Sequence, residues 1–242
     1  MTSHDGVTIT WLGHAATLIE TSDSKRILID PWLVHNPATP SDRKRLDRLD
    51  LMLITHGHSD HMADAVAVAR ATEPDVVCNF EIAQWLQGKG VGKTAGMAHG
   101  GTVTWNGIAI TMVEAVHGSG ISDGDQVVYG GVAAGLVLRF GDGFTFYHAG
   151  DTDVFESMKL IRDLHHPHAA MLPIGGHFTM DPMRAACALR MLDLRAVIPI
   201  HYGTFPLLAG TPEQLKAETK DLSALRIVAL KPGESVGQSE LV

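Results

Sequence analysis

The segment His56-Gly57-His58-Ser59-Asp60-His61 places three imidazoles and a carboxylate within six residues. Imidazole is a common ligand of borderline metal ions, and a carboxylate can compensate the charge of a second cation. Because side chains along so short a stretch point in different directions, these four groups could hardly close around one tetrahedral ion. The spacing indicates ligands for two adjacent ions, and a merely solvated polar loop has no need of this composition.

Three further segments have a common form, in which an apolar strand ends at a potential ligand and a glycine. They contain His117 in 113–118, Asp151 in 146–152 and His201 in 197–203. Glycine allows the backbone to turn sharply at such a point. A single histidine or aspartate of this kind is more often structural, but together these three would supply the ligands that two ions still lack.

Strand and helix patterns alternate along the chain and must position these groups. The polar turn 21–25 separates strands 16–20 and 27–30 and predicts a hairpin, while the apolar run 51–54 predicts a buried strand that leads to His56. Helix-forming residues over 62–70 predict that a helix follows directly. No linker interrupts the pattern, so we expect one α/β domain spanning residues 1–242. Further elements are expected at 7–11, 76–77, 82–86, 103–116, 132–140, 144–148, 154–164, 169–174, 183–192, 196–200, 211–220 and 225–230.

A weak internal repeat relates the two halves of the chain. Residues 15–30 resemble 133–151, and 53–58 resemble 172–177, which places His177 opposite His58. If the similarity is not due to chance, the chain forms two sheet-plus-helix halves.

Composition limits the class of partner. The 242 residues carry a net charge of −8, which argues against a broad nucleic-acid-binding face because such a face needs clustered Lys and Arg. The amino terminus lacks a cationic region that leads into an apolar stretch, and no apolar run is long enough to span a bilayer. Cys78 and Cys187 lie in apolar sequence surroundings, so we expect two buried thiols in a reducing compartment, the cytoplasm.

The ordered motifs resemble the metallo-β-lactamase superfamily. Its branch of small, largely uncharacterised metal-dependent hydrolases, related to L-ascorbate-6-phosphate lactonase, is similar over nearly the whole chain. The resemblance implies a four-layer αββα sandwich of two mixed β-sheets flanked by helices. The motifs that carry it, besides those around the predicted ligands, are 10–15, 29–32, 172–176, 178–180 and 199–205.

Carried over to this chain, the resemblance implies a complete ligand set for two ions. The first ion would be bound by His56, His58 and His117, the second by Asp60, His61 and His201, and Asp151 would bridge them. Zinc suits these ligands, with manganese or iron as alternatives. His14 and Asp30 are candidates for orienting ligand imidazoles, with a purely structural role as the alternative, and His177 is a candidate for contacting substrate.

Two ions that share a water can generate hydroxide at neutral pH and polarise a carbonyl or phosphoryl oxygen. We therefore expect a hydrolase of a small ester, lactone or phosphodiester, with Asp60 and Asp151 as the candidate catalytic side chains. The alternatives are an RNA or DNA phosphodiesterase and a non-catalytic metal-binding partner protein. A homo-oligomer is compatible with each of these three functions. The glycine-rich segment 118–131 is expected to be a flexible wall over the metal site, or else a plain surface connection.

Overall fold

The computed structural model describes residues 6–242, so residues 1–5, on which the argument against a leader sequence partly rests, lie outside the described chain. The chain divides into two compact units. Unit 1 comprises residues 6–98, 118–133 and 231–239, and unit 2 comprises 99–117, 134–230 and 240–242. No helix within 6–242 has the length and apolarity needed to cross a membrane.

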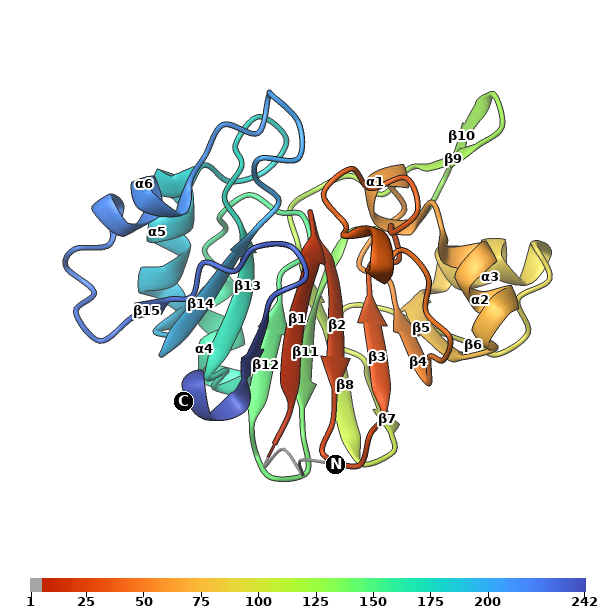
Figure 1. The fold of residues 1–242 in the computed structure, drawn as a ribbon, viewed down its shortest axis with the longest axis horizontal. Coiled ribbons are helices and arrows are strands. Elements are labelled where there is room, and N and C mark those ends of the chain that lie inside the picture. The colour runs from red at the N-terminus through yellow and green to blue at the C-terminus, as the bar shows by residue number, and fades with distance from the viewer. Residues whose placement is uncertain (1–5) are drawn as a thin grey trace. The chain divides into compact units, whose positions relative to one another are not determined.

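Unit 1 contains a seven-stranded mixed sheet in the order β16-β1-β2-β3-β4-β5-β6 (Figure 1). The expected hairpin is present, because β2 pairs antiparallel with β3, and β3 to β6 then run parallel. The strand bounds are β1 (Thr8–Gly13), β2 (Ala16–Glu20), β3 (Arg26–Ile29), β4 (Leu51–Leu53), β5 (Asp75–Asn79), β6 (Thr94–Met97) and β16 (Ser235–Gly237).

The helices of unit 1 pack on one face of this sheet. Met62, Ala65 and Ala69 from the first two helices, and Ile82 and Leu86 from the third, share a buried core with the strands. Burying a leucine or isoleucine side chain contributes about 1.5–3 kcal/mol, so this core stabilises the sheet edge that carries the ligand motif. The helical elements are η1 (Ser41–Arg43), α1 (Ser59–Met62), α2 (Ala65–Thr72) and α3 (Phe80–Gly88).

The helix expected over 62–70 is divided in two, between α1 and α2. Asp64 lies at the break, where its Oδ2 accepts hydrogen bonds from the backbone of Leu33 at 2.6 Å and of Val34 at 2.7 Å. Its own N–H donates to the carbonyl of Pro31. These contacts with the loop after β3 turn the chain away from a continuous helix.

Unit 2 contains a second seven-stranded mixed sheet, in the order β15-β14-β13-β12-β11-β8-β7. Strands β7, β8, β11 and β12 pair antiparallel, and β12 to β15 pair parallel. The strand bounds are β7 (Thr102–Trp105), β8 (Ile108–Glu114), β11 (Ala134–Arg139), β12 (Thr145–His148), β13 (Ala169–Pro173), β14 (Ala196–Ile200) and β15 (Arg226–Ile227).

Three helices pack on one face of the sheet of unit 2. Their buried residues, such as Met158, Leu189 and Leu215, form a core with Leu172 and Val197 of the strands. Pro182 and Pro212 lie in the first turn of α5 and α6, where the missing N–H of proline costs nothing. The bounds are α4 (Met158–His165), α5 (Pro182–Leu192) and α6 (Pro212–Glu218). The short helix η2 (Gln238–Glu240) has its first two residues in unit 1 and its third in unit 2.

The segment 118–131 is not without secondary structure. It forms an antiparallel hairpin of β9 (Ile121–Asp123) and β10 (Gln126–Val128), and Ile121 is buried in the core of unit 1. Asp123 joins the hairpin to α3, because its carboxylate accepts from Trp85 Nε1 at 2.9 Å and from Lys89 Nζ at 2.7 Å. The segment is therefore not an irregular loop, and its role as a flexible wall over the metal site stays a prediction.

The prediction for the cysteines is half correct. Both thiols are free, and Cys78 is buried on β5, where burial raises its pKa to about 12. Cys187 is exposed, contrary to expectation. It lies on the outer face of α5, whose buried residues Ala185, Ala188 and Leu189 face the sheet instead.

The expected α/β class, with two mixed sheets and flanking helices, is confirmed. The two sheets also share a topology, because a run of antiparallel strands is followed by parallel strands in both. The segments aligned in the internal repeat form equivalent strands. Strands β2 and β3 have the same positions in the sheet of unit 1 as β11 and β12 have in the sheet of unit 2. The division into one domain remains a prediction.

Candidate metal centre

Sheet topology gathers the candidate residues of unit 1 at one edge. Strands β3 and β4 are parallel, with Ile29 beside Leu53, so Asp30 and the chain after Leu53 leave the sheet on the same side. Strand β1 runs in the same direction as β3, since both pair antiparallel with β2, and His14 follows its end. The short helix α1 then carries Asp60 and His61.

Asp30 is a buried carboxylate with three hydrogen-bond donors. Its Oδ1 accepts from the Thr55 backbone at 2.8 Å, and its Oδ2 accepts from Thr55 Oγ1 at 2.8 Å and lies 2.7 Å from His61 Nδ1. Asp30, Thr55 and His61 all have no exposed surface. These contacts balance the cost of burying the charge and fix the orientation of the His61 ring.

Thr55 extends this control to a second imidazole. Its hydroxyl hydrogen is donated to Asp30, so its oxygen is left to accept from His56 Nδ1, 3.0 Å away. A proton on Nδ1 leaves Nε2 as the lone-pair nitrogen that a metal needs. The sequence analysis missed Thr55, although its place between the end of β4 and the first histidine of the motif was visible.

The remaining histidines of the motif lie close together. The His56 and His61 rings are 4.1 Å apart between centroids, and His56 Nε2 is 3.1 Å from His58 Nδ1. His58 is partly buried, with extended backbone just before α1. Imidazole nitrogens at this separation, in a largely buried setting, form a donor set that suits a divalent cation.

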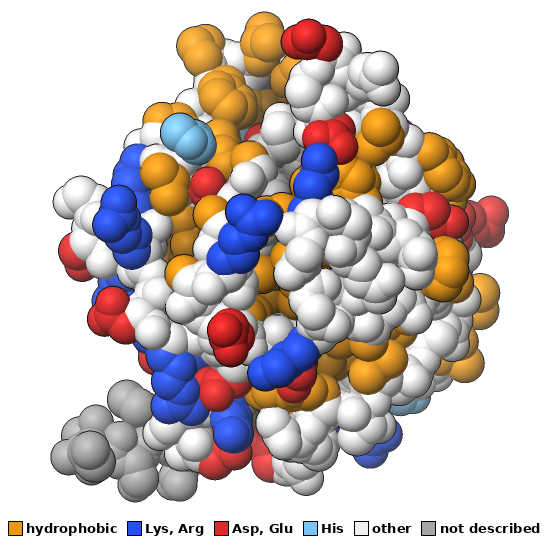
Figure 2. All heavy atoms as spheres, turned by 90° about the vertical axis from the view of Figure 1, so that its right-hand side faces the viewer, with side chains coloured by type: hydrophobic (Ala, Val, Ile, Leu, Met, Phe, Trp, Pro, Cys, Tyr) orange, Lys and Arg blue, Asp and Glu red, His pale blue; other side chains and the backbone are white. Residues whose placement is uncertain are grey.

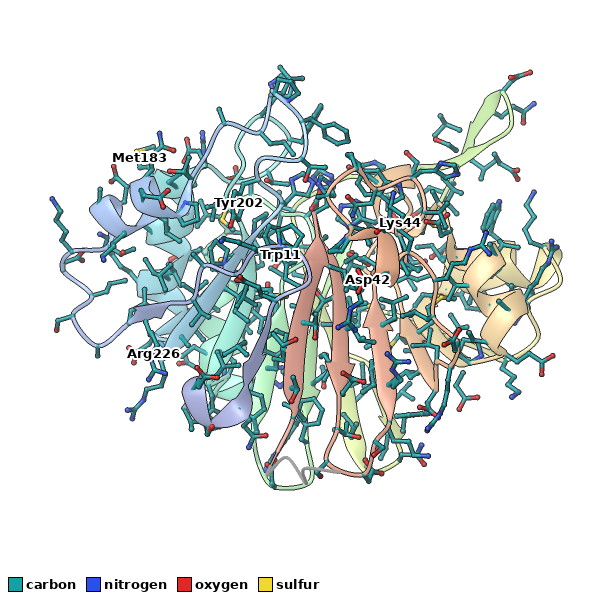
Figure 3. The ribbon with its side chains drawn as sticks, in the orientation of Figure 1. Trp11, Asp42, Lys44, Met183, Tyr202 and Arg226 are labelled. Atoms are coloured by element: carbon teal, nitrogen blue, oxygen red, sulfur yellow. The ribbon has the colours of Figure 1, made fainter. Side chains whose placement is uncertain are left out.

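His14 is buried beside Asp60, with its Nε2 3.0 Å from Asp60 Oδ2. The Trp11 indole, labelled in Figure 3, donates to the His14 carbonyl at 2.9 Å. His14 and Asp30 both have a positive φ, near 56° and 55°. Such a conformation costs a non-glycine residue about 1–3 kcal/mol and is concentrated at functional sites. The structure thus brings His14 to a predicted carboxylate ligand.

Unit 2 holds the other predicted ligands at one edge of its own sheet. Strands β12, β13 and β14 are parallel, and Asp151 and His201 follow the ends of β12 and β14. Strand β8 runs in the same direction, because both it and β12 pair antiparallel with β11, and it leads to His117. The three residues therefore leave the sheet on one side.

Asp151 lies within reach of both histidines of unit 2. Its Oδ2 is 3.0 Å from His201 Nε2 and 3.6 Å from His117 Nε2. Asp151 and His201 are buried, and His117 is partly buried. Thr152 links the loop after β12 to the loop after β8, because its Oγ1 accepts a hydrogen bond from the backbone N–H of Val116 at 2.9 Å. One carboxylate oxygen thus lies close to the Nε2 atoms of two imidazoles.

Two other histidines of unit 2 have different surroundings. His148 is buried, and its Nδ1 accepts from the Gly150 backbone at 3.1 Å, so it holds the turn that presents Asp151. His177 is exposed, with its ring against Phe178 at 4.4 Å. His177 is thus more accessible than the predicted ligands of the same unit.

The donor set fits a metal ion by its chemistry. It consists of imidazole nitrogens and carboxylate oxygens, and Thr55 and Asp30 contact the Nδ1 atoms of His56 and His61, as is usual around metal-binding histidines. Within unit 1, Asp30, His56 and His61 each offer one ligand atom, and these atoms lie within 4.8 Å of one another. Zn²⁺, Mn²⁺ and Fe²⁺ all accept such ligands.

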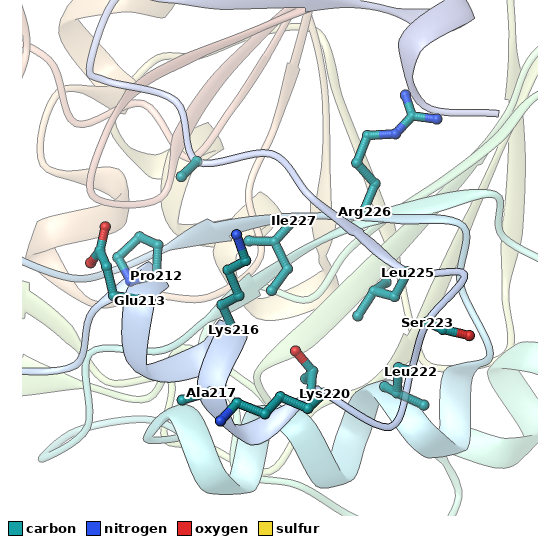
Figure 4. Close-up of a pocket in the computed structure, with 12 residues that line it drawn as sticks. Pro212, Glu213, Lys216, Ala217, Lys220, Leu222, Ser223, Leu225, Arg226 and Ile227 are labelled. Carbon is teal, nitrogen blue, oxygen red and sulfur yellow. The ribbon is translucent and has the colours of Figure 1, made fainter.

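A cavity of about 850 Å³ lies elsewhere in unit 2, between α6 and residues 219–229 (Figure 4). Lys216, Lys220 and Arg226 line it together with apolar side chains such as Leu222 and Ile227. None of its lining residues is a predicted ligand, so this cavity is not the candidate metal centre.

Comparison with known proteins places the chain in a family. The model of the β-lactamase superfamily domain matches residues 25–202. The UPF0173 metal-dependent hydrolase of Koribacter versatilis is 52% identical over 230 residues, which are 95% of this chain and 97% of the relative. That of Methanopyrus kandleri is 44% identical over 228 residues, or 94% and 98% of the two chains.

A solved structure supports the same assignment. A metallo hydrolase from the hyperthermophilic archaeon Ignicoccus hospitalis is 35% identical, with a TM-score of 0.83 over 95% of this chain and 97% of that one. Two mixed sheets with flanking helices and these matches define a protein of the metallo-β-lactamase fold. The chain belongs to the β-lactamase superfamily and, within it, to the UPF0173 metal-dependent hydrolase family.

Membership of this family confirms the prediction of a metal-dependent hydrolase. The relation to L-ascorbate-6-phosphate lactonase remains a prediction.

Proposed function

We propose that this hydrolase binds two divalent ions through the predicted ligands and cleaves a small ester, lactone or phosphodiester. His56, His58 and His117 would bind one ion, and Asp60, His61 and His201 the other. Asp151 would be shared between them.

The observation that carries this proposal is the position of the Asp151 carboxylate. Its Oδ2 lies 3.0 Å from His201 Nε2 and 3.6 Å from His117 Nε2, two histidines assigned to different ions. A carboxylate oxygen that reaches the donor atoms of both sets is suited to bridge two cations. Neither histidine would need to move far to share this oxygen with a metal ion.

The contacts in unit 1 support the same proposal. Asp30 holds His61 directly and His56 through Thr55, by way of the Nδ1 atom of each ring. Ligand histidines characteristically donate their second ring N–H to a carboxylate or another acceptor. Asp30 and Thr55 are thus proposed as positioning residues that aim both Nε2 atoms at the ions.

Two divalent ions, when bound, would lower the pKa of a coordinated water and polarise the carbonyl or phosphoryl oxygen of the substrate. The chain's own residues would bind the ions, orient the ligands and hold protons. Asp60 is proposed to accept a proton from the attacking water while it remains a ligand. His14 would orient the Asp60 carboxylate, because its Nε2 lies 3.0 Å from Asp60 Oδ2. Zinc is the proposed native metal, with Mn²⁺ and Fe²⁺ as alternatives.

The charge of the chain favours a small substrate over a nucleic acid. The net charge is −8, and the face shown in Figure 2 has Lys and Arg side chains interspersed with Asp and Glu. Nucleic-acid binding depends on clustered cations that release counterions. Two free cysteines fit a reducing compartment, so a cytoplasmic location is part of the proposal. Assembly into a homo-oligomer is a separate part of it.

Hydrolysis of a substrate panel tests the proposed function. The metal-loaded protein should hydrolyse at least one class among simple esters, lactones and phosphodiesters, and a chelator should abolish that turnover. A gel shift with RNA and DNA at physiological salt should show no complex. Turnover that survives complete removal of metal, or metal binding without turnover of any class, would contradict the proposal.

A further inference from the structure

Ser119 lies in unit 1 at the base of the β9–β10 hairpin, where the two ends of the hairpin segment meet. The residue is 6% exposed, and its Oγ donates to the Gly130 carbonyl at 2.7 Å. Asn79 closes the same base, because its Nδ2 donates to the carbonyls of Gly130 at 2.7 Å and Val132 at 3.0 Å.

The same Ser119 hydroxyl also contacts the predicted metal-ligand loop. Its Oγ accepts a hydrogen bond from the backbone N–H of Gly57 at 3.0 Å, between His56 and His58. The neighbouring chain passes close to the second histidine, since a Cβ placed on Gly118 would lie 3.4 Å from His58 Nε2. A hydroxyl is required here because the atom must accept from Gly57 and donate to Gly130 at once.

Two glycines make this close approach sterically feasible. A Cβ on Gly57 would lie 2.6 Å from the Ser119 carbonyl oxygen, and a Cβ on Gly130 would lie 2.0 Å from it. Both glycines are buried, so a side chain at either position would have to displace packed neighbours. The glycine of the ligand motif is thus explained by the approach of Ser119, besides any need for a turn.

From this geometry we propose that Ser119 is a positioning residue of the metal centre, which fixes the backbone between His56 and His58 against the base of the hairpin. The inference rests on the proposed function, because it presumes that these two histidines bind metal. Loss of the hydroxyl would leave the buried Gly57 N–H without its acceptor and allow the two imidazoles to diverge.

The test is the affinity of the full-length apoprotein for Zn²⁺, measured by competition with a chromophoric chelator. Ser119→Ala should raise the dissociation constant about 10- to 100-fold, the usual effect of removing a group that orients metal ligands. Ser122→Ala is the matched control, since Ser122 is exposed on β9, and it should bind as the wild type does. Amide hydrogen exchange should also increase at residues 56–58 in Ser119→Ala only.

Wild-type zinc affinity in folded Ser119→Ala would overturn the inference. If that variant does not fold, Asn79→Asp takes its place, because it retains the oxygen that accepts from Ile82 at the start of α3 and removes the donors to Gly130 and Val132. It should also weaken zinc binding, and an unchanged constant would overturn the inference equally. Failure of the wild type to bind zinc would instead refute the proposed function, and this inference with it.

Discussion

The buried carboxylate of Asp30 contacts His61 directly and His56 through the Thr55 hydroxyl, and we propose that it orients both imidazoles. Asp30→Asn keeps the size of the side chain but removes the charge and one acceptor site that serve Thr55 and His61. We expect metal affinity to fall about 10- to 100-fold. Chelator competition measures this, with exposed Asp47→Asn as control. Unchanged affinity in folded Asp30→Asn would show that the contact is purely structural.

His201 and His177 form a matched pair for testing the ligand assignment of unit 2. Both have a positive φ, near 57° and 59°, but His201 is buried beside Asp151 whereas His177 is exposed. His201→Ala should lose at least one ion per chain, and His177→Ala should retain both. Elemental analysis of folded protein gives the answer. Equal metal loss in the two variants would mean that the wrong histidine is assigned.

The two cysteines should differ in reactivity. Burial raises the pKa of Cys78 to about 12, so its thiol stays protonated and shielded at neutral pH, whereas Cys187 is exposed on α5. Because the thiolate is the nucleophile, iodoacetamide should modify Cys187 in the folded protein and Cys78 only after denaturation. Peptide mass spectrometry distinguishes the sites. Rapid modification of Cys78 in the native protein would contradict the described core.

At the scale of elements, the strands that carry ligands could be predicted from sequence and several others could not. The apolar runs before His56, Asp151 and His201 correspond to β4, β12 and β14, because buried parallel strands are continuously apolar. The elements that differ from the sequence prediction depend on tertiary contacts. Asp64 ends α1 through bonds to a distant loop, and β16 is a short edge strand paired with residues at the other end of the chain.

The β9–β10 hairpin was missed for a related reason. Its strands have only three residues each, and the hairpin is stabilised by the buried Ile121 and by the hydrogen bond from Trp85 of α3 to Asp123, contacts that depend on the folded chain. Likewise, candidate ligands could be proposed from residue type and spacing, but the contacts of Thr55 and Ser119 could not. Their roles depend on hydrogen bonds to residues that are neighbours only in the folded chain.

Asp123 should control the mobility of this hairpin. Asp123→Ala removes the acceptor of Trp85 and Lys89 and should increase amide exchange over residues 121–128 several-fold. Asp125→Ala, at the exposed turn, is the control.

The hydrogen bonds from Lys89 and Trp85 lower the pKa of Asp123 from its ordinary value of 3.8. The stabilisation is thus complete above the ordinary pKa and is lost only as the pH falls through the lowered value. Protection factors over residues 121–128 that already fall between pH 7 and pH 5 would contradict this account.

At the scale of the whole molecule, two units with the same sheet topology each supply part of one predicted ligand set. Unit 1 contributes His56, His58, Asp60 and His61, and unit 2 contributes His117, Asp151 and His201. The central proposal is therefore that the protein binds two ions and that Asp151 is a ligand shared by both.

Metal stoichiometry in wild-type protein and in Asp151→Ala tests this claim most directly. After reconstitution with zinc and removal of excess metal, elemental analysis should find two ions per wild-type chain. Folded Asp151→Ala should hold fewer than one, because the shared carboxylate is lost from both ions. Two ions per chain in Asp151→Ala, or no more than one in the wild type, would contradict a bridged pair.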